Sequence, residues 1–178
     1  MKSSTHIIAS GYIGVIAALG MNTEPKDTLI ILAASAAGSI IPDIDKKGSK
    51  VSNKNIATGI TSKFVRTFAS HRGFTHTFLG SGIISLLLVY LISILPIEAN
   101  KHIYMLIFIG LFLGMISHIL LDALNPKGVM LIWPLSRRRF NLMSIRTGTA
   151  GEFIFRIMLL IGLMLLVITF LTYRGFIN

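Results

Sequence analysis

Long uncharged stretches alternate with short polar ones along the whole chain. Four stretches contain no charged residue: 7–23, 28–42, 77–97 and 157–173. A fifth apolar stretch, 103–121, contains His118 as its one ionisable group. A helix that crosses a bilayer needs about 20 apolar residues, within a range of roughly 17 to 25. The pattern therefore predicts five transmembrane helices, placed at approximately 6–22, 28–42, 75–96, 103–123 and 153–173.

The first two predicted helices are short and rich in small residues. The first contains Ser10, Gly11, Gly14 and Ala18, and the second contains the sequence AASAAG at 33–38. Small residues at four-residue spacing let helix backbones approach closely in lipid, where apolar burial alone gives no drive to associate. We therefore expect these two to be inner helices. The predicted fold class is all-α, an integral membrane helical bundle of about five transmembrane helices that forms a single domain over residues 1–178.

The composition agrees with a membrane protein. Hydrophobic residues make up 53% of the 178 residues and charged residues only 13%, whereas about a quarter are charged in soluble domains. Lys2 before an apolar run resembles the start of a signal peptide, but no clear cleavage site followed by a soluble domain is present. Because the chain has no cysteine, any bound metal must be held by histidine, carboxylate or backbone oxygen.

The net charge of +10 is concentrated in two connections. Residues 46–72 contain seven Lys and Arg residues and no acid, and residues 125–151 contain five and no acid. Excess Lys and Arg in alternate loops is the positive-inside pattern, which predicts a multi-pass inner-membrane protein with its N-terminus and both basic loops in the cytoplasm. Because topology and anionic lipid account for these charges, nucleic acid is not expected as a partner, and the oligomeric state is left open.

Ionisable residues gather at one end of the predicted helices. In this topology every helix brings at least one histidine or carboxylate to its cytoplasmic end. The residues concerned are His6, Asp43, Asp45, His71, Arg72, His76, His118, Asp122 and Glu152. Ionisable groups inside a membrane are costly and are by default functional, unless they only pair with one another. The sequence therefore predicts a layer of metal ligands at the cytoplasmic ends of the helices.

Several of these groups also have a plainer interpretation. His6 alone fits an interfacial histidine, and Glu152 fits an acid in the first turn of a helix. The motif PDID at 42–45 fits a helix stop, although the helix dipole opposes carboxylates at a C-terminus. The motif HRGFTH at 71–76 fits an N-terminal cap, with its arginine as one more positive-inside residue. The pair in HILLD at 118–122 is harder to explain in this way, because positions i and i+4 share one helix face.

Imidazole and carboxylate groups together suit a divalent metal. They fit zinc, manganese or iron, and the mixture does not select one of these. A metal with an open coordination position activates water, so hydrolysis is the natural chemistry. His71 would be a ligand or general acid, and Arg72 could clamp a phosphate oxygen. The expected metal ligands are His6, Asp43, Asp45, His76, His118, Asp122 and Glu152.

The motifs together resemble a known family. They are TH at 5–6, PDID at 42–45, HRGFTH at 71–76, HILLD at 118–122 and WPLS at 133–136. In this order they resemble the YdjM-type family of LexA-regulated, membrane-bound metal-dependent hydrolases, over most of the chain from His6 to about Glu152. This resemblance implies a small integral membrane protein with a divalent-metal hydrolase centre.

A more distant similarity connects the same residues to the zinc-dependent phospholipase C and P1 nuclease group. The matching positions are His6, Asp45, His76, His118 and Asp122. That group also uses its N-terminal amine and a further histidine motif, whereas no histidine follows His118 here. The similarity implies zinc as the metal, with one or two ions rather than three, and leaves manganese or iron as alternatives.

The leading hypothesis is a metal-dependent hydrolase that cleaves a phosphoester of a lipid or lipid-linked substrate at the inner leaflet. A lipid headgroup would lie level with the ligand layer. One alternative is a metal-ion or proton-coupled transporter, although transport sites usually lie near the bilayer midplane. Another is a scaffold or regulator with a structural metal. Trp133 is expected to anchor at the interface, and Arg137, Arg138 and Arg139 either attract an anionic headgroup or serve topology alone.

Overall fold

The described part of the chain is a bundle of α-helices. The computed structural model describes residues 1–43, 74–96 and 99–176. Its helices are α1 (Ser3–Gly20), α2 (Pro25–Gly38), α4 (Phe78–Ser93), α5 (Lys101–Ala123) and α6 (Ala150–Tyr173), with two short 3-10 turns, η1 (Ile41–Asp43) and η2 (Phe74–His76). Within these ranges no β-strand forms, and a single bridge joins Val129 to Phe140. The predicted all-α helical bundle is therefore confirmed.

The helices differ in their capacity to cross a membrane. α1, α5 and α6 are long and apolar enough to span a bilayer, and α4 is apolar but has 16 residues. α2 has 14 residues and ends at Gly38, so the prediction of one helix over 28–42 is wrong at its C-terminal end. Pro42 explains this boundary, since proline has no N–H and disfavours helix in the residue before it. The chain instead closes the separate turn η1.

Close backbone contact between α2 and α5 forms the centre of the bundle. A Cβ atom at Gly114 of α5 would lie 2.1 Å from the carbonyl oxygen of Ser35, and one at Gly38 of α2 would lie 2.3 Å from that of Leu111. Only glycine at both positions permits this approach. The hydroxyl of Ser35 donates a 3.0 Å hydrogen bond to the carbonyl oxygen of Ser10 on α1. These contacts join α2 closely to both α1 and α5.

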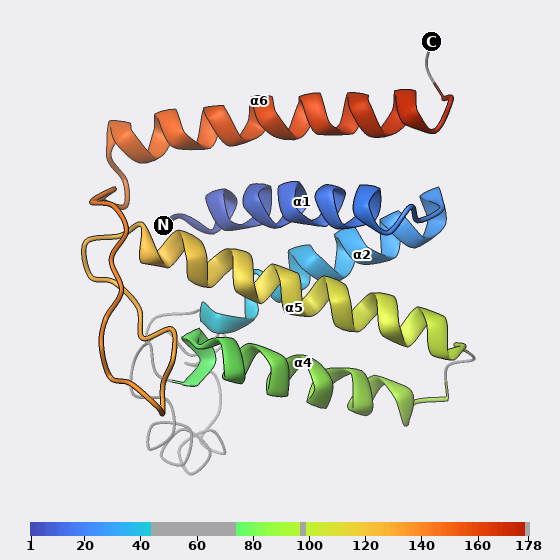
Figure 1. Ribbon diagram of the computed structural model, residues 1–178, viewed down its shortest axis with the longest axis horizontal. Helices are drawn as coiled ribbons and strands as arrows, with labels where there is room; N and C mark the ends of the chain where they lie inside the picture. Colours follow the sequence, from blue (N-terminus) through green and yellow to red (C-terminus); the bar gives the residue numbers. More distant parts are fainter. Residues whose placement is uncertain (44–73, 97–98, 177–178) are drawn as a thin grey trace, which may run out of the picture.

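α6 lies on the outside of the bundle and packs against α1 (Figure 1). Only 6% of its most apolar segment is buried within the protein, although that segment has a mean hydropathy of 2.7. In water such a surface would be strongly unfavourable, whereas in a bilayer it faces hydrocarbon. The distribution of apolar surface therefore requires a lipid environment.

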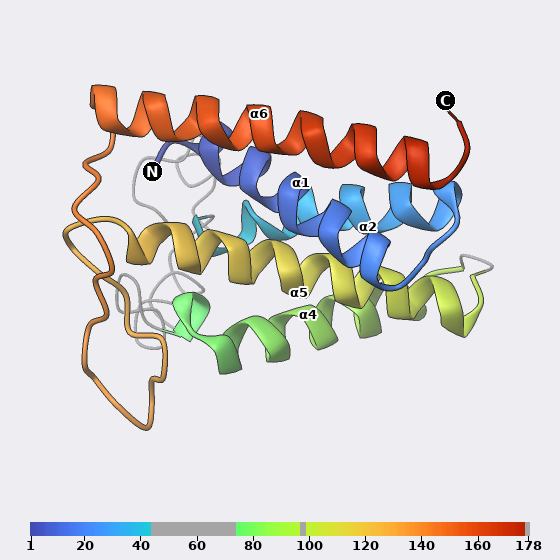
Figure 2. The same ribbon diagram turned by 45° about the horizontal axis from the view of Figure 1, so that its top comes forward.

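The helices run alternately in opposite directions, so five of their ends meet at one side of the bundle. Figures 1 and 2 show the starts of α1, α4 and α6 together with the ends of α2 and α5 at this side. We call it the N-terminal end of the bundle. Antiparallel packing thus brings residues between positions 1 and 152 of the chain to one end of the bundle. The topology predicted from charge also requires these residues to lie at one end.

Candidate metal centre

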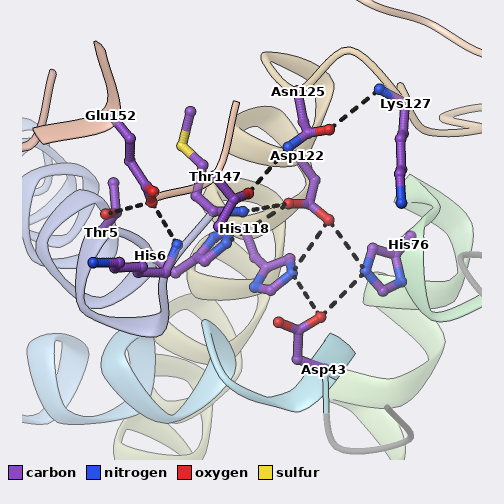
Figure 3. A network of polar contacts seen from close by, with 12 residues as sticks. Thr5, His6, Asp43, His76, His118, Asp122, Asn125, Lys127, Thr147 and Glu152 are labelled. Carbon is purple, nitrogen blue, oxygen red and sulfur yellow. Dashed lines mark hydrogen bonds and ion pairs between the residues drawn. The ribbon is translucent and has the colours of Figure 1, made fainter. Parts of the chain in front are cut away.

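Two aspartates and two histidines converge at the N-terminal end of the bundle. Asp43 lies in η1, His76 in η2, and both His118 and Asp122 lie near the end of α5. One ligand atom from each of the four lies within 4.8 Å of all the others. Figure 3 shows the two carboxylates and the two imidazole rings pointing at one another from three separate elements.

The distances between these groups are longer than hydrogen bonds and close to those between ligands of one metal ion. The Nε2 atom of His118 lies 3.5 Å from Oδ1 of Asp43 and 3.9 Å from Oδ2 of Asp122. The Nε2 atom of His76 lies 3.8 Å from Oδ1 of Asp43 and 3.7 Å from Oδ2 of Asp122. With metal–ligand bonds of about 2.1 Å, two ligands of a tetrahedral site are about 3.4 Å apart. The spacing therefore fits four donors around one cation.

The hydrogen bonding of His118 leaves its Nε2 atom available as a ligand. Its Nδ1 atom lies 2.7 Å from the carbonyl oxygen of Ser39. Because a carbonyl only accepts, Nδ1 must donate, and the neutral ring then carries a lone pair on Nε2. The Nε2 atoms of His118 and His76 are both buried and form no hydrogen bond with the described residues. A histidine whose other ring nitrogen donates to a carbonyl is the usual arrangement at metal sites.

The charges of the cluster, like its geometry, indicate a cation-binding site. Asp122 is fully buried, and 18% of the Asp43 side chain is exposed. Both carboxylates lie where a helical segment ends, and the negative end of the helix dipole opposes anions there. One divalent cation balances the two carboxylates, and the α-amino group of Met1 adds a further positive charge beside Asp122, so the negative charge of the cluster is compensated and the cost of burial is lower. The site is thus suited to a single divalent ion.

His6 lies beside this group rather than within it. Its ring stacks on that of His118, with centroids 3.8 Å apart and planes inclined by 14°. Its Nε2 atom lies 3.7 Å from Oδ1 of Asp122, the carboxylate oxygen that faces away from the other two histidines. Both ring nitrogens of His6 are buried and form no hydrogen bond with the part of the chain that the structure describes. The α-amino group of Met1 approaches the same Asp122 oxygen at 3.3 Å.

Glu152 lies in the first turn of α6, as its plainer interpretation predicts. Its carboxylate accepts hydrogen bonds from the backbone N–H of Lys2, from the hydroxyl of Thr5 at 3.1 Å and from the backbone N–H of Gly148 at 2.6 Å. The described residues that could share one metal ion are the four named above, and Glu152 is outside that group. Its contacts join the start of α1 to the start of α6 and the loop before it (Figure 3).

Three residues singled out in the sequence, Asp45, His71 and Arg72, lie outside the described residues. Their expected roles as metal ligand, ligand or general acid, and phosphate clamp therefore stay predictions. The described part of the motif HRGFTH, residues 74–76, forms η2 rather than the start of α4. The helix cap is the next residue, Thr77, whose hydroxyl accepts from the N–H of Gly80 at 2.9 Å.

The sequence analysis did not predict two features near the centre. The first is the backbone carbonyl of Ser39, which orients His118. A backbone group of this kind cannot be predicted from a pattern of side chains. Lys127 follows the end of α5, and Figure 3 shows its side chain extending towards His76. Its N–H is held 3.2 Å from Oδ1 of Asn125. Its position five residues after Asp122 is a signal in the sequence, but the positive-inside pattern accounts for a basic residue there equally well.

A bundle of apolar helices with a buried Asp and His cluster at one end defines a membrane protein with a candidate divalent-metal site. The chain belongs to the YdjM inner membrane protein family, which matches residues 1–176. No solved structure matches it.

Curated relatives from two bacterial groups support this assignment. The uncharacterized protein YvsG of Bacillus subtilis is 31% identical over 85% of this chain and 85% of its own length. The inner membrane protein YdjM of Escherichia coli is 33% identical over 63% of this chain and 53% of its own length. The chain therefore spans about half of the second relative and most of the first.

Proposed function

We propose that this protein is a membrane-bound metal-dependent hydrolase that cleaves a phosphoester of a lipid or lipid-linked substrate at the inner leaflet. The observation that carries the proposal is the convergence of Asp43, His76, His118 and Asp122, with two buried Nε2 atoms that form no hydrogen bond with the described residues. These four residues would bind the metal. When bound, the metal supplies a Lewis acid and a water molecule more acidic than bulk water.

The exposure of the cluster supports a catalytic over a purely structural ion. Three of the four donors are almost completely buried, while Asp43 is 18% exposed. This side of the cluster is therefore the one from which water and a phosphate group would approach. A structural ion held by all four side chains is the second candidate, because four donors can fill a tetrahedral shell.

The proposed reaction is simple in its balance. Water adds its oxygen to phosphorus and gives up a proton, the bond from phosphorus to the ester oxygen breaks, and the leaving alkoxide takes up a proton to become the free alcohol. Lys127, which extends towards His76 (Figure 3), would bind a phosphate oxygen, and Arg72 would do the same if it lies over the site. His71 would act as a ligand or as the general acid.

The position of the cluster supports a lipid substrate and speaks against transport. All four donors lie on elements that meet at the N-terminal end of the bundle (Figure 1), which the positive-inside pattern assigns to the cytoplasm. A phospholipid headgroup lies at this depth, and its chains would extend along apolar helices. A transporter generally binds its ion near the middle of the membrane, on interrupted helices. α5, which carries two of the donors, is continuous.

The test is to purify the full chain in detergent, quantify bound metal, and assay hydrolysis of phospholipids and soluble phosphoesters. We expect about one divalent ion per chain and turnover of at least one phospholipid. His118→Ala and Asp122→Ala should lose both, and His102→Ala at the opposite end should keep both. Metal binding without turnover of any substrate would favour the structural ion, and full metal content in both variants would disprove the centre.

A further inference from the structure

Exposed apolar and basic side chains lie next to each other in the connection between α5 and α6. Leu135 is 89% exposed and Ile132 is 46% exposed. Arg137, Arg138 and Arg139 follow after one serine and are all exposed. No aspartate or glutamate occurs between Asp122 and Glu152. This surface is therefore strongly cationic and also unusually apolar.

Backbone and ring contacts hold the segment 129–140 in place. Val129 and Phe140 form a bridge through two backbone hydrogen bonds of 3.0 and 2.8 Å, which closes the segment into a hairpin. The N–H of Phe78, at the start of α4, donates to the carbonyl oxygen of Leu131 at 3.2 Å. The ring of Trp133 meets that of Phe74 edge-on, with centroids 6.2 Å apart. We call residues 129–140 the arginine hairpin.

The arginine hairpin extends sideways from the bundle at the depth of the helix ends. In Figures 1 and 2 the orange connection crosses the end of α5, passes beyond the start of α4 and then returns to α6. It does not extend away along the direction of the helix axes. Beside a membrane-spanning bundle, a segment at this depth lies over lipid, where hydrocarbon meets headgroups.

We propose that the arginine hairpin is a docking surface for the anionic phospholipid headgroups of the leaflet that surrounds this end of the bundle. Leu135 and Ile132 would enter the acyl boundary, and the three arginines would bind phosphates. A role in topology alone accounts for the charges, but it does not require an exposed leucine beside them. The combination of exposed apolar groups with a basic cluster is the pattern of interfacial lipid binding. The proposal does not depend on hydrolysis at the metal centre.

The class of lipid follows from charge complementarity with the arginines. Zwitterionic headgroups offer no net charge to three adjacent guanidinium groups, whereas anionic headgroups do. Each basic residue near an anionic surface strengthens binding about fivefold. Even with incomplete additivity, we expect the hairpin to prefer phosphatidylglycerol over phosphatidylcholine by at least about tenfold.

Trp133 is the only tryptophan in the chain, so it reports on the hairpin without labelling. The full chain is reconstituted into phosphatidylcholine vesicles that contain an equal minor fraction of either brominated phosphatidylglycerol or brominated phosphatidylcholine. We expect quenching of Trp133 fluorescence by both lipids and much stronger quenching by brominated phosphatidylglycerol. The preference should weaken in high salt, because salt screens exposed charges.

Two variants separate the hairpin from general charge effects. The triple variant Arg137→Gln, Arg138→Gln, Arg139→Gln should lose the phosphatidylglycerol preference and keep quenching by both lipids. The control Lys26→Gln, Lys101→Gln removes exposed charges at the opposite end and should keep the preference. Equal quenching by the two lipids in the wild type, absence of any quenching, or a preference that survives the triple variant would each overturn the proposal. None of these readouts uses substrate turnover, so a failure of the proposed hydrolase activity would be seen separately.

Discussion

Removal of one ligand nitrogen from His118 should remove most of the stabilisation of the protein by metal. In His118→Asn the amide nitrogen can still donate to the carbonyl oxygen of Ser39, the bond that Nδ1 makes at 2.7 Å. The Nε2 atom, 3.5 Å from Oδ1 of Asp43, has no counterpart in asparagine. The substitution therefore removes the predicted ligand and retains the hydrogen bond that positions it.

The magnitude follows from binding linkage. A metal at 100 times its dissociation constant stabilises the folded protein by about 2.7 kcal/mol. For a chain of this length that corresponds to a rise in Tm of roughly 5–11 °C. Loss of one ligand that weakens binding about 100-fold leaves about 0.4 kcal/mol at the same metal concentration, or roughly 1–2 °C.

The assay is thermal unfolding of the detergent-solubilised protein, with zinc and with a chelator, for wild type and variant. His102→Asn is the matched control, because His102 bonds to Asp27 at 2.8 Å at the opposite end of the bundle. It should keep the full metal-dependent shift. The reasoning would be refuted by a His118→Asn protein whose Tm rises with zinc as much as that of the wild type.

Three further substitutions test the fold and the surroundings of the site by the same unfolding assay. Gly114→Ala would place a Cβ atom 2.1 Å from a carbonyl oxygen of α2, so it should lower the free energy of unfolding by at least about 3 kcal/mol and reduce the yield of folded protein. The control Gly82→Ala, with a nearest contact of 3.8 Å, should be tolerated. Equal stability of the two variants would contradict the α2–α5 packing. Glu152→Gln should lower the free energy of unfolding by about 2 kcal/mol, because one acceptor oxygen facing backbone N–H groups becomes a donor. It should leave the zinc-dependent shift in Tm unchanged. Loss of that shift without loss of stability would instead support Glu152 as a metal ligand. Thr77→Ala should lower stability by about 1 kcal/mol through loss of the cap on α4, and Thr77→Ser should recover it, since serine offers the same acceptor.

The existence of the five described helices could be predicted because it depends on local properties. Uncharged stretches predict helices through the length of bilayer that they must cross, and all five have counterparts in the structure. Helix ends were less predictable. α2 ends four residues before the predicted boundary at Pro42, since a proline acts on the residues before it and the composition of the stretch does not show where the chain begins to turn.

Glycine contacts illustrate what packing adds. The sequence suggested close approach from the small residues of α1 and α2, but the closest approach also requires Gly110 and Gly114 on α5. These two glycines lie four residues apart in a strongly apolar stretch, and this spacing by itself indicates close helix packing. Their role depends on which face of α5 meets α2, and that choice is made by the whole bundle.

The sequence by itself determined the chemistry available to this protein. The chain has no cysteine, so its histidines and carboxylates, gathered at one end of antiparallel helices, are the side chains that could form a candidate site for a divalent metal. The tertiary structure decided which of them meet. Asp43, His76, His118 and Asp122 share one small volume, His6 stacks behind His118, and Glu152 binds backbone N–H groups and a hydroxyl instead. The physical reason is that membership in a metal site depends on distances of a few ångströms between elements distant in the chain, and these are set by helix packing rather than by any local pattern.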